Sequence, residues 1–104
     1  MKKHLLTSLA TLGLATAAFA QGEIVIGEIE SLTGNKAGFG NELHNATKLA
    51  VEEINAAGGI LGKKIVHKIE DTQSKPGEPA AAIRKLISRD KVVAVLGEYA
   101  SSLS

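Results

Sequence analysis

Three serines that follow a run of apolar residues are the first candidates for chemistry. The apolar run Val92–Leu96 leads through Gly97 to Ser101, Ser102 and Ser104. Serine hydroxyls and free backbone N–H groups at a helix start can bind a carboxylate or a phosphate through charge-assisted hydrogen bonds. Serine is also a preferred helix-capping residue. From spacing alone, anion binding and simple capping are equally good interpretations.

Two glutamates and two histidines could also support chemistry. Glu28 and Glu30 alternate with an isoleucine near the end of the first apolar run, a pattern compatible with paired carboxylates in acid–base catalysis. No nucleophile accompanies them, so the pattern does not favour an enzyme. His44 and His67 have no partner at ligand spacing, which favours a packed or solvated role over metal binding. The sequence therefore predicts neither catalytic residues nor a metal site.

The glycine-rich stretch Glu30–Gly40 does not encode a nucleotide site. Its glycines, Gly34, Gly38 and Gly40, do not form G-x-G-x-x-G, and no phosphate-binding G-x-x-x-x-G-K-[ST] occurs. No cofactor is expected. We expect Asp71, at the end of the second apolar run, to cap its own loop.

Composition excludes further classes of function. The chain has no cysteine, which rules out a thiolate metal site, a cysteine nucleophile and a lipid-modified N-terminal cysteine. Phe19, Phe39 and Tyr99 are its only aromatic residues, and its formal net charge is +1 without a run of like charge. These features argue against a nucleic-acid partner and against a basic membrane-binding patch.

Residues 1–20 have the pattern of a cleavable secretory signal peptide. Lys2 and Lys3 give a basic start, Leu5–Ala18 is mostly apolar, and Ala18-Phe19-Ala20 fits a small-x-small cleavage site. The apolar run is too short to span a membrane. We therefore expect an exported, periplasmic protein that has no membrane insertion after cleavage, with residues 21–104 as its folded part.

Hydrophobic periodicity predicts alternating strands and helices after residue 20. The expected elements are a strand at Glu23–Ile29, a helix at Asn41–Ala57 ended by Gly58-Gly59, a strand at Lys64–Glu70, a helix at Ala80–Asp90 with Ile83, Leu86 and Ile87 facing inward, and a strand at Val92–Leu96. This β-α-β-α-β order predicts a parallel α/β sheet, because crossovers between parallel strands are right-handed. The middle strand is half polar and belongs at an edge, which gives the strand order 2-1-3. Ligands bind such sheets at the carboxyl ends of the strands, where the three loops are expected to meet.

Five ordered motifs resemble the periplasmic solute-binding proteins of branched-chain amino acid ABC transporters. They cover nearly all of 21–104: IGEIESLTG (Ile26–Gly34), AGFG (Ala37–Gly40), LAVEEINAAGGILGKKI (Leu49–Ile65), EDTQSKP (Glu70–Pro76) and VVAVLGEYASSLS (Val92–Ser104). The resemblance implies a type I receptor with two lobes that close on a small solute. It also implies that 21–104 is a truncated N-terminal lobe.

The resemblance implies roles for individual residues. The loop after the third strand offers Ser101, with Ser102, to the carboxylate of an amino acid, while Tyr99 and Ala100 line the pocket. Phe39 packs against the ligand and lacks the hydroxyl of the tyrosine that is often found at this position. The implied partners are an amino acid, branched-chain or related, and the membrane permease of an ABC transporter.

A second hypothesis is the ligand-binding lobe of an exported sensor or hydrolase. A catalytic domain or a transmembrane helix encoded beyond Ser104 would favour it. Under either hypothesis, three strands and two helices leave apolar surface uncovered, so we expect 21–104 alone to fall below the usual domain stability of about 5–15 kcal/mol. A cooperative thermal transition of that piece would contradict this expectation.

Overall fold

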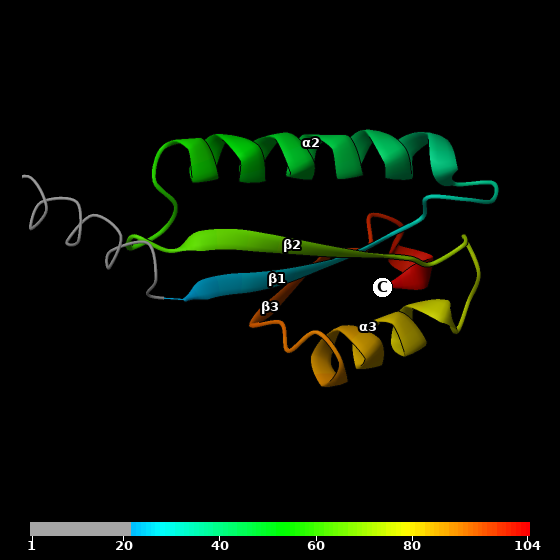
Figure 1. Cartoon of the computed structure of the whole chain (residues 1–104). Helices are drawn as coiled ribbons and strands as arrows, with labels where there is room; N and C mark the ends of the chain where they lie inside the picture. The colour runs from blue at the N-terminus through cyan, green and yellow to red at the C-terminus, as the bar shows by residue number, and fades with distance from the viewer. Residues whose placement is uncertain (1–21) are drawn as a thin grey trace, which may run out of the picture.

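The computed structural model describes residues 22–104 (Figure 1). The predicted signal peptide lies outside the described residues. The elements in chain order are β1 (Glu23–Glu30), α2 (Ala37–Ala56), β2 (Lys64–Asp71), α3 (Glu78–Ser88), β3 (Ala94–Gly97) and a single 3₁₀ turn, η1 (Ser101–Leu103). None of the helices in this described part is long and apolar enough to cross a membrane.

The three strands form one parallel sheet in the order β2-β1-β3, which confirms the predicted fold class. Ile26 of β1 lies opposite His67 of β2 on one side and Ala94 of β3 on the other. The half-polar strand β2 is at an edge, as its alternation predicts. The amide of Asn55 in α2 bonds both main-chain groups of Ile65 there, at 2.9 and 2.8 Å.

The two helices cover opposite faces of the sheet (Figure 1). The face under α3 is apolar, with Ile29, Ala82 and Leu86 as its buried cluster. Gly27 lies beneath Leu86, so close that a Cβ at Gly27 would be 2.9 Å from Leu86 Cδ1. Leu86 is fully buried, whereas Ile87 is 55% exposed, so the expectation that Ile87 faces inward is wrong.

Helix α2 begins at Ala37, four residues before the predicted start at Asn41. Two glycines inside the first turns suggested a loop, but Gly40 is buried against the backbone of Ser31, where a Cβ would be 1.8 Å from the carbonyl oxygen. The glycine thus permits close packing instead of breaking the helix. The predicted end is confirmed, since Gly58 and Gly59 adopt φ of 107° and 80° after the last turn.

The apolar stripe that marks α2 in the sequence is not the face that meets the sheet. Leu43, Leu49 and Ile54 are 43%, 56% and 37% exposed. The less exposed positions lie one residue further around the helix: Gly40, His44, Thr47, Val51 and Asn55.

Strand β3 also differs from the expected strand at Val92–Leu96, because it begins at Ala94 and is largely exposed. Considerable apolar surface is therefore exposed in 22–104.

Candidate functional site

The loops after β1, β2 and β3 meet at the carboxyl end of the sheet, as predicted, and Asp71 joins the first two. Its Oδ1 accepts hydrogen bonds from the amides of Leu32 and Gln73 at 2.9 and 2.8 Å, and its Oδ2 accepts one from the Thr33 hydroxyl. Burial raises the pKa of Asp71, but these hydrogen bonds outweigh it and hold the pKa below the usual 3.8. The loop-capping role expected of Asp71 is confirmed.

Glu98, which follows β3 directly, joins all three loops. It is 5% exposed, and its Oε2 accepts hydrogen bonds from the hydroxyls of Ser31 and Thr72 at 3.0 and 2.6 Å. Its Oε1 accepts one from the Ala100 amide at 3.2 Å. Both hydroxyls are fully buried. One carboxylate therefore fixes the position of the loop that carries the predicted ligand-binding residues.

A second buried carboxyl, Glu30, supports the same loop. Its Oε1 accepts a hydrogen bond from the Tyr99 amide at 3.1 Å. Burial raises the pKa of Glu30, and the neighbouring carboxyl of Glu98 raises it further, against the effect of the Tyr99 hydrogen bond.

The sequence does not predict that Glu98, Ser31 and Thr72 hold the three loops together. The only signal is their position directly after three neighbouring strands.

The structure brings Phe39 and Tyr99 together. Their ring centroids are 6.0 Å apart with a 53° tilt, within the range of favourable aromatic pairs. The Tyr99 hydroxyl donates a hydrogen bond to the Lys36 carbonyl at 3.1 Å, which fixes the tyrosine ring beside the start of α2. Phe39 is 68% exposed. An exposed aromatic surface is thus available where the first and third loops meet.

Ser101 and Ser102 begin the turn η1, two residues after Tyr99 in sequence. Ser101 and Ser102 are exposed, and the turn is preceded by Ala100, without a side-chain cap. Simple capping by Ser101 or Ser102 is therefore not observed. Ser104 bonds back to the carbonyls of Glu98 and Ala100. The side chains of Ser101 and Ser102 remain accessible to a solute.

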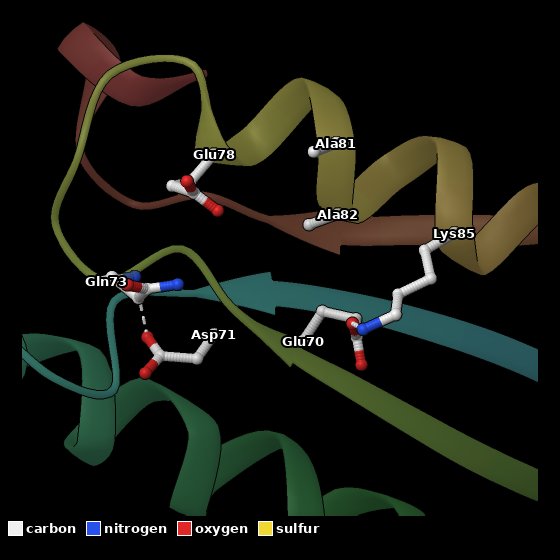
Figure 2. Close-up of a pocket in the computed structure, with 7 residues that line it drawn as sticks. All are labelled: Glu70, Asp71, Gln73, Glu78, Ala81, Ala82 and Lys85. Carbon is white, nitrogen blue, oxygen red and sulfur yellow. Dashed lines mark hydrogen bonds and ion pairs between the residues drawn. The ribbon is translucent and has the colours of Figure 1, made fainter.

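Two hollows flank this end of the sheet. One, of about 410 Å³, lies between α2 and β3 and is lined by Glu28, Glu30, Leu43, Ala46, Thr47, and Leu96–Tyr99. The other lies beside α3 (Figure 2). In that second hollow, Glu70 forms an ion pair with Lys85 at 2.8 Å, and Asp71 is engaged by its own loop. Glu70, Lys85 and Asp71 therefore already have partners, and the hollow contains none of the predicted ligand-binding residues.

The two histidines, which are far apart in sequence, meet on the α2 face of the sheet. His44 Nδ1 and His67 Nε2 lie 2.9 and 2.8 Å from the same oxygen, Oε1 of Glu28. Glu28 is 1% exposed. Both histidines are packed, as expected, but the expectation that they lack a ligand-type partner is wrong, because the partner comes from β1. Glu28 and Glu30 do not form a carboxylate pair for catalysis, since each is engaged by a different set of partners.

Comparison with known proteins agrees with this geometry. Residues 23–104 match the family described as periplasmic binding protein. The chain belongs to this family. The resemblance seen in the five sequence motifs is thereby confirmed.

Individual relatives point to one branch of the family. The chain is 36% identical over 99 residues to the Leu/Ile/Val-binding protein BraC3 of Rhizobium johnstonii, covering 95% of this chain and 27% of the relative. It is 40% identical over 100 residues to the Leu/Ile/Val-binding protein homolog 3 of Brucella melitensis, covering 93% and 26%. The chain therefore spans about a quarter of the length of these curated relatives.

A solved structure shows the same fold. The branched-chain amino acid transporter substrate binding protein LivJ from Streptococcus pneumoniae, determined in complex with isoleucine, superposes with a TM-score of 0.76 at 38% identity. The match covers 78% of this chain and 23% of LivJ. A protein from Rhodospirillum rubrum described as a putative branched-chain amino acid ABC transporter superposes with a TM-score of 0.73 at 28% identity.

Proposed function

We propose that this chain is the N-terminal part of an exported receptor that binds an amino acid between two lobes and delivers it to an ABC transporter permease. The observation that carries the proposal is the loop after β3, where exposed Ser101 and Ser102 follow the Phe39–Tyr99 pair in a family of solute-binding proteins. The named relatives are Leu/Ile/Val-binding proteins, which favours a branched-chain or related amino acid. The protein acts in the periplasm and is not an enzyme.

In this proposal Ser101 donates hydrogen bonds to the ligand's α-carboxylate, with Ser102 beside it. Charge-assisted bonds to a carboxylate are roughly twice as strong as those between neutral groups. Tyr99 and Ala100 line the pocket and Phe39 covers the ligand's apolar part. Glu98 contributes indirectly, because its bonds to the first two loops hold the third loop in place. The ligand's ammonium group would be bound by the second lobe.

Calorimetry on the protein that carries both lobes tests this function. We expect one site for at least one aliphatic amino acid, and a loss of about 10-fold or more in affinity for Ser101→Ala, since one bond to a charged group contributes about 1.5–3 kcal/mol. Ser88→Ala is the matched control, because Ser88 is an exposed serine on α3 whose hydroxyl donates a hydrogen bond to the Arg84 carbonyl of its own helix at 2.8 Å. Absence of binding to any amino acid, amide or small carboxylate would exclude the proposed class of ligand.

A further inference from the structure

One group of metal-ligating side chains in the described part of the chain is outside the loop that we assign to the amino acid. Glu28, His44 and His67 each present one ligand atom, and the three atoms lie within 4.8 Å of one another. They come from three elements: β1, α2 and β2. The two histidine rings are tilted by 41° with centroids 5.6 Å apart.

Strand register explains why these side chains share a face. His67 lies opposite Ile26, and residues two apart on a strand point to the same side, so Glu28 is the diagonal neighbour of His67. Helix α2 covers this face and brings His44 over Glu28. The donor set is therefore held by the sheet and by a 20-residue helix, and not by a mobile loop.

The cluster contains one carboxylate and no permanently charged cation among the described residues. Glu28 is buried, its side chain is 2% exposed, and it has two imidazoles on one oxygen. Two neutral imidazoles leave one buried negative charge, which is costly unless it is paired or coordinated. Lys and Arg do not reach Glu28 in the described residues, where its only ion-pair partners are the two histidines. A proton on one ring or a divalent cation would each balance the carboxylate.

The identity of the donors selects among divalent cations. Two imidazole nitrogens and one carboxylate oxygen are a known set of three protein ligands for Zn²⁺. Water or a substrate atom then takes the fourth coordination position. Mg²⁺ and Ca²⁺ prefer oxygen ligands. Nitrogen and oxygen ligands of tetrahedral zinc lie ~3.3 Å apart. The two nitrogen–oxygen distances of 2.9 and 2.8 Å must therefore lengthen slightly on binding, and the three ligand atoms, which lie within 4.8 Å of one another, must rearrange around the ion.

We propose that Glu28, His44 and His67 form a Zn²⁺ site that links α2 to β1 and β2. Zinc binds His44 Nδ1, His67 Nε2 and Glu28 Oε1, while each ring keeps its one proton on its other nitrogen. Glu28 also lines the hollow of about 410 Å³ between α2 and β3. A water molecule or another small ligand can reach the fourth coordination position of the zinc from this hollow. This site is separate from Ser101, so its failure would leave the proposed amino acid receptor unaffected.

Zinc titration of the full 104-residue chain, purified without a polyhistidine tag, tests the proposal. The titration is made in sucrose, which strengthens burial and keeps a marginal wild type folded. The probe is Zn²⁺ in competition with a chromophoric chelator, and Co²⁺ absorption reports the coordination geometry. We expect one equivalent bound at micromolar or tighter affinity, and a tetrahedral Co²⁺ spectrum. Glu28→Gln, His44→Gln and His67→Gln, which keep a hydrogen-bonding amide, should each weaken zinc binding by about 100-fold or more, at or beyond the upper end of the effect of losing an outer-shell partner.

Two matched controls separate this site from casual chelation. His4→Gln removes the one histidine of the sequence outside the cluster, and Glu42→Gln removes an exposed carboxylate from the same helix. Both should bind zinc as the wild type does. Absence of stoichiometric zinc binding, equal loss in His4→Gln, or full retention in Glu28→Gln would overturn the proposal.

A measurement on the wild type covers the case in which a cluster variant does not fold. Zinc should shift the NMR ring resonances of His44 and His67 together at one equivalent and leave those of His4 unchanged. If the His4 ring shifts while the other two do not, zinc binds outside the cluster and the proposal is wrong.

Discussion

The two faces of the sheet are built from the same three strands and differ sharply in chemistry. Under α3, an isoleucine, an alanine and a fully buried leucine form one cluster, and the leucine lies against Gly27. Under α2, the buried groups include Glu28 and Glu30, and the helix presents a histidine, a threonine and an asparagine. Apolar burial stabilises a fold by about 25 cal/mol per Å², whereas buried polar groups must first recover their lost hydration.

This difference indicates that the two faces serve different purposes. The α3 face stabilises the fold through buried apolar contacts. The α2 face places carboxylates, hydroxyls and imidazoles beside the loops where a solute would bind. The following four predictions test this contrast through urea midpoints, measured with EDTA and with sucrose, which strengthens burial and keeps a marginal wild type folded.

The largest effect is expected from Leu86→Ala on the apolar face. Leu86 is fully buried, so the cavity and the lost transfer energy should destabilise the fold by about 2–5 kcal/mol. Ile87→Ala on the same helix is the control, because Ile87 is 55% exposed and should change stability by about 0.5 kcal/mol or less. Equal effects at the two positions would mean that this face is not the core.

The next effect concerns two glycines in the first turns of α2. Gly40→Ala places a Cβ against the Ser31 carbonyl, which should cost about 1–3 kcal/mol or more by overpacking. Gly38→Ala meets no atom within 4 Å and should stabilise the helix by about 0.5–1 kcal/mol. Opposite signs in the urea midpoint are the expected result. The same sign for both would contradict the close approach of α2 to the first loop.

Replacing Glu28 alone on the polar face should destabilise the fold more than replacing the whole cluster with apolar residues. Glu28→Leu leaves the imidazoles of His44 and His67 without their acceptor, at a cost of about 1–2 kcal/mol. Replacing all three residues by leucine should recover most of that loss, because apolar substitution of a buried polar group is often neutral or stabilising. If the triple variant is the least stable of the series, the cluster itself provides cohesion.

The smallest effect is a pH-dependent one at Asp71. Its pKa is lower in the folded chain than the usual 3.8, so ionised Asp71 stabilises the fold above that pH, and this contribution is lost as pH falls through the folded value. Asp71→Asn should therefore reduce stability by about 1 kcal/mol at pH 7 and by progressively less below pH 4. A constant difference between variant and wild type across this range would contradict the role of the charge.

Local patterns in the sequence predict much of the fold. The alternation in Lys64–Glu70 places β2 at an edge, and the apolar run after Glu23 places β1 at the centre. Helix ends are less predictable. Gly40 suggests a break when only its own conformational freedom is considered, yet its neighbour across space, Ser31, makes it a packing residue.

Some features of the candidate site can also be predicted from the sequence, and others cannot. The loop after β3 and its position near Phe39 follow from motif order, because the carboxyl ends of adjacent parallel strands meet at one edge of the sheet. The contact between the Phe39 and Tyr99 rings is known only from the structure. Glu98 could not be recognised as the residue that fixes this loop. Its partners, Ser31 and Thr72, are 67 and 26 residues away in sequence, and no local pattern encodes such distances.

The sequence by itself determined the strand order, the family and the position of the serine loop, since these depend on periodicity and on the order of motifs. Only the tertiary structure decided which face of α2 meets the sheet and which carboxylates are buried. Register sets His67 diagonal to Glu28, and packing sets His44 above them. Glu28, His44 and His67 come from three separate elements, β1, α2 and β2, so their side chains come into contact only when the chain has folded.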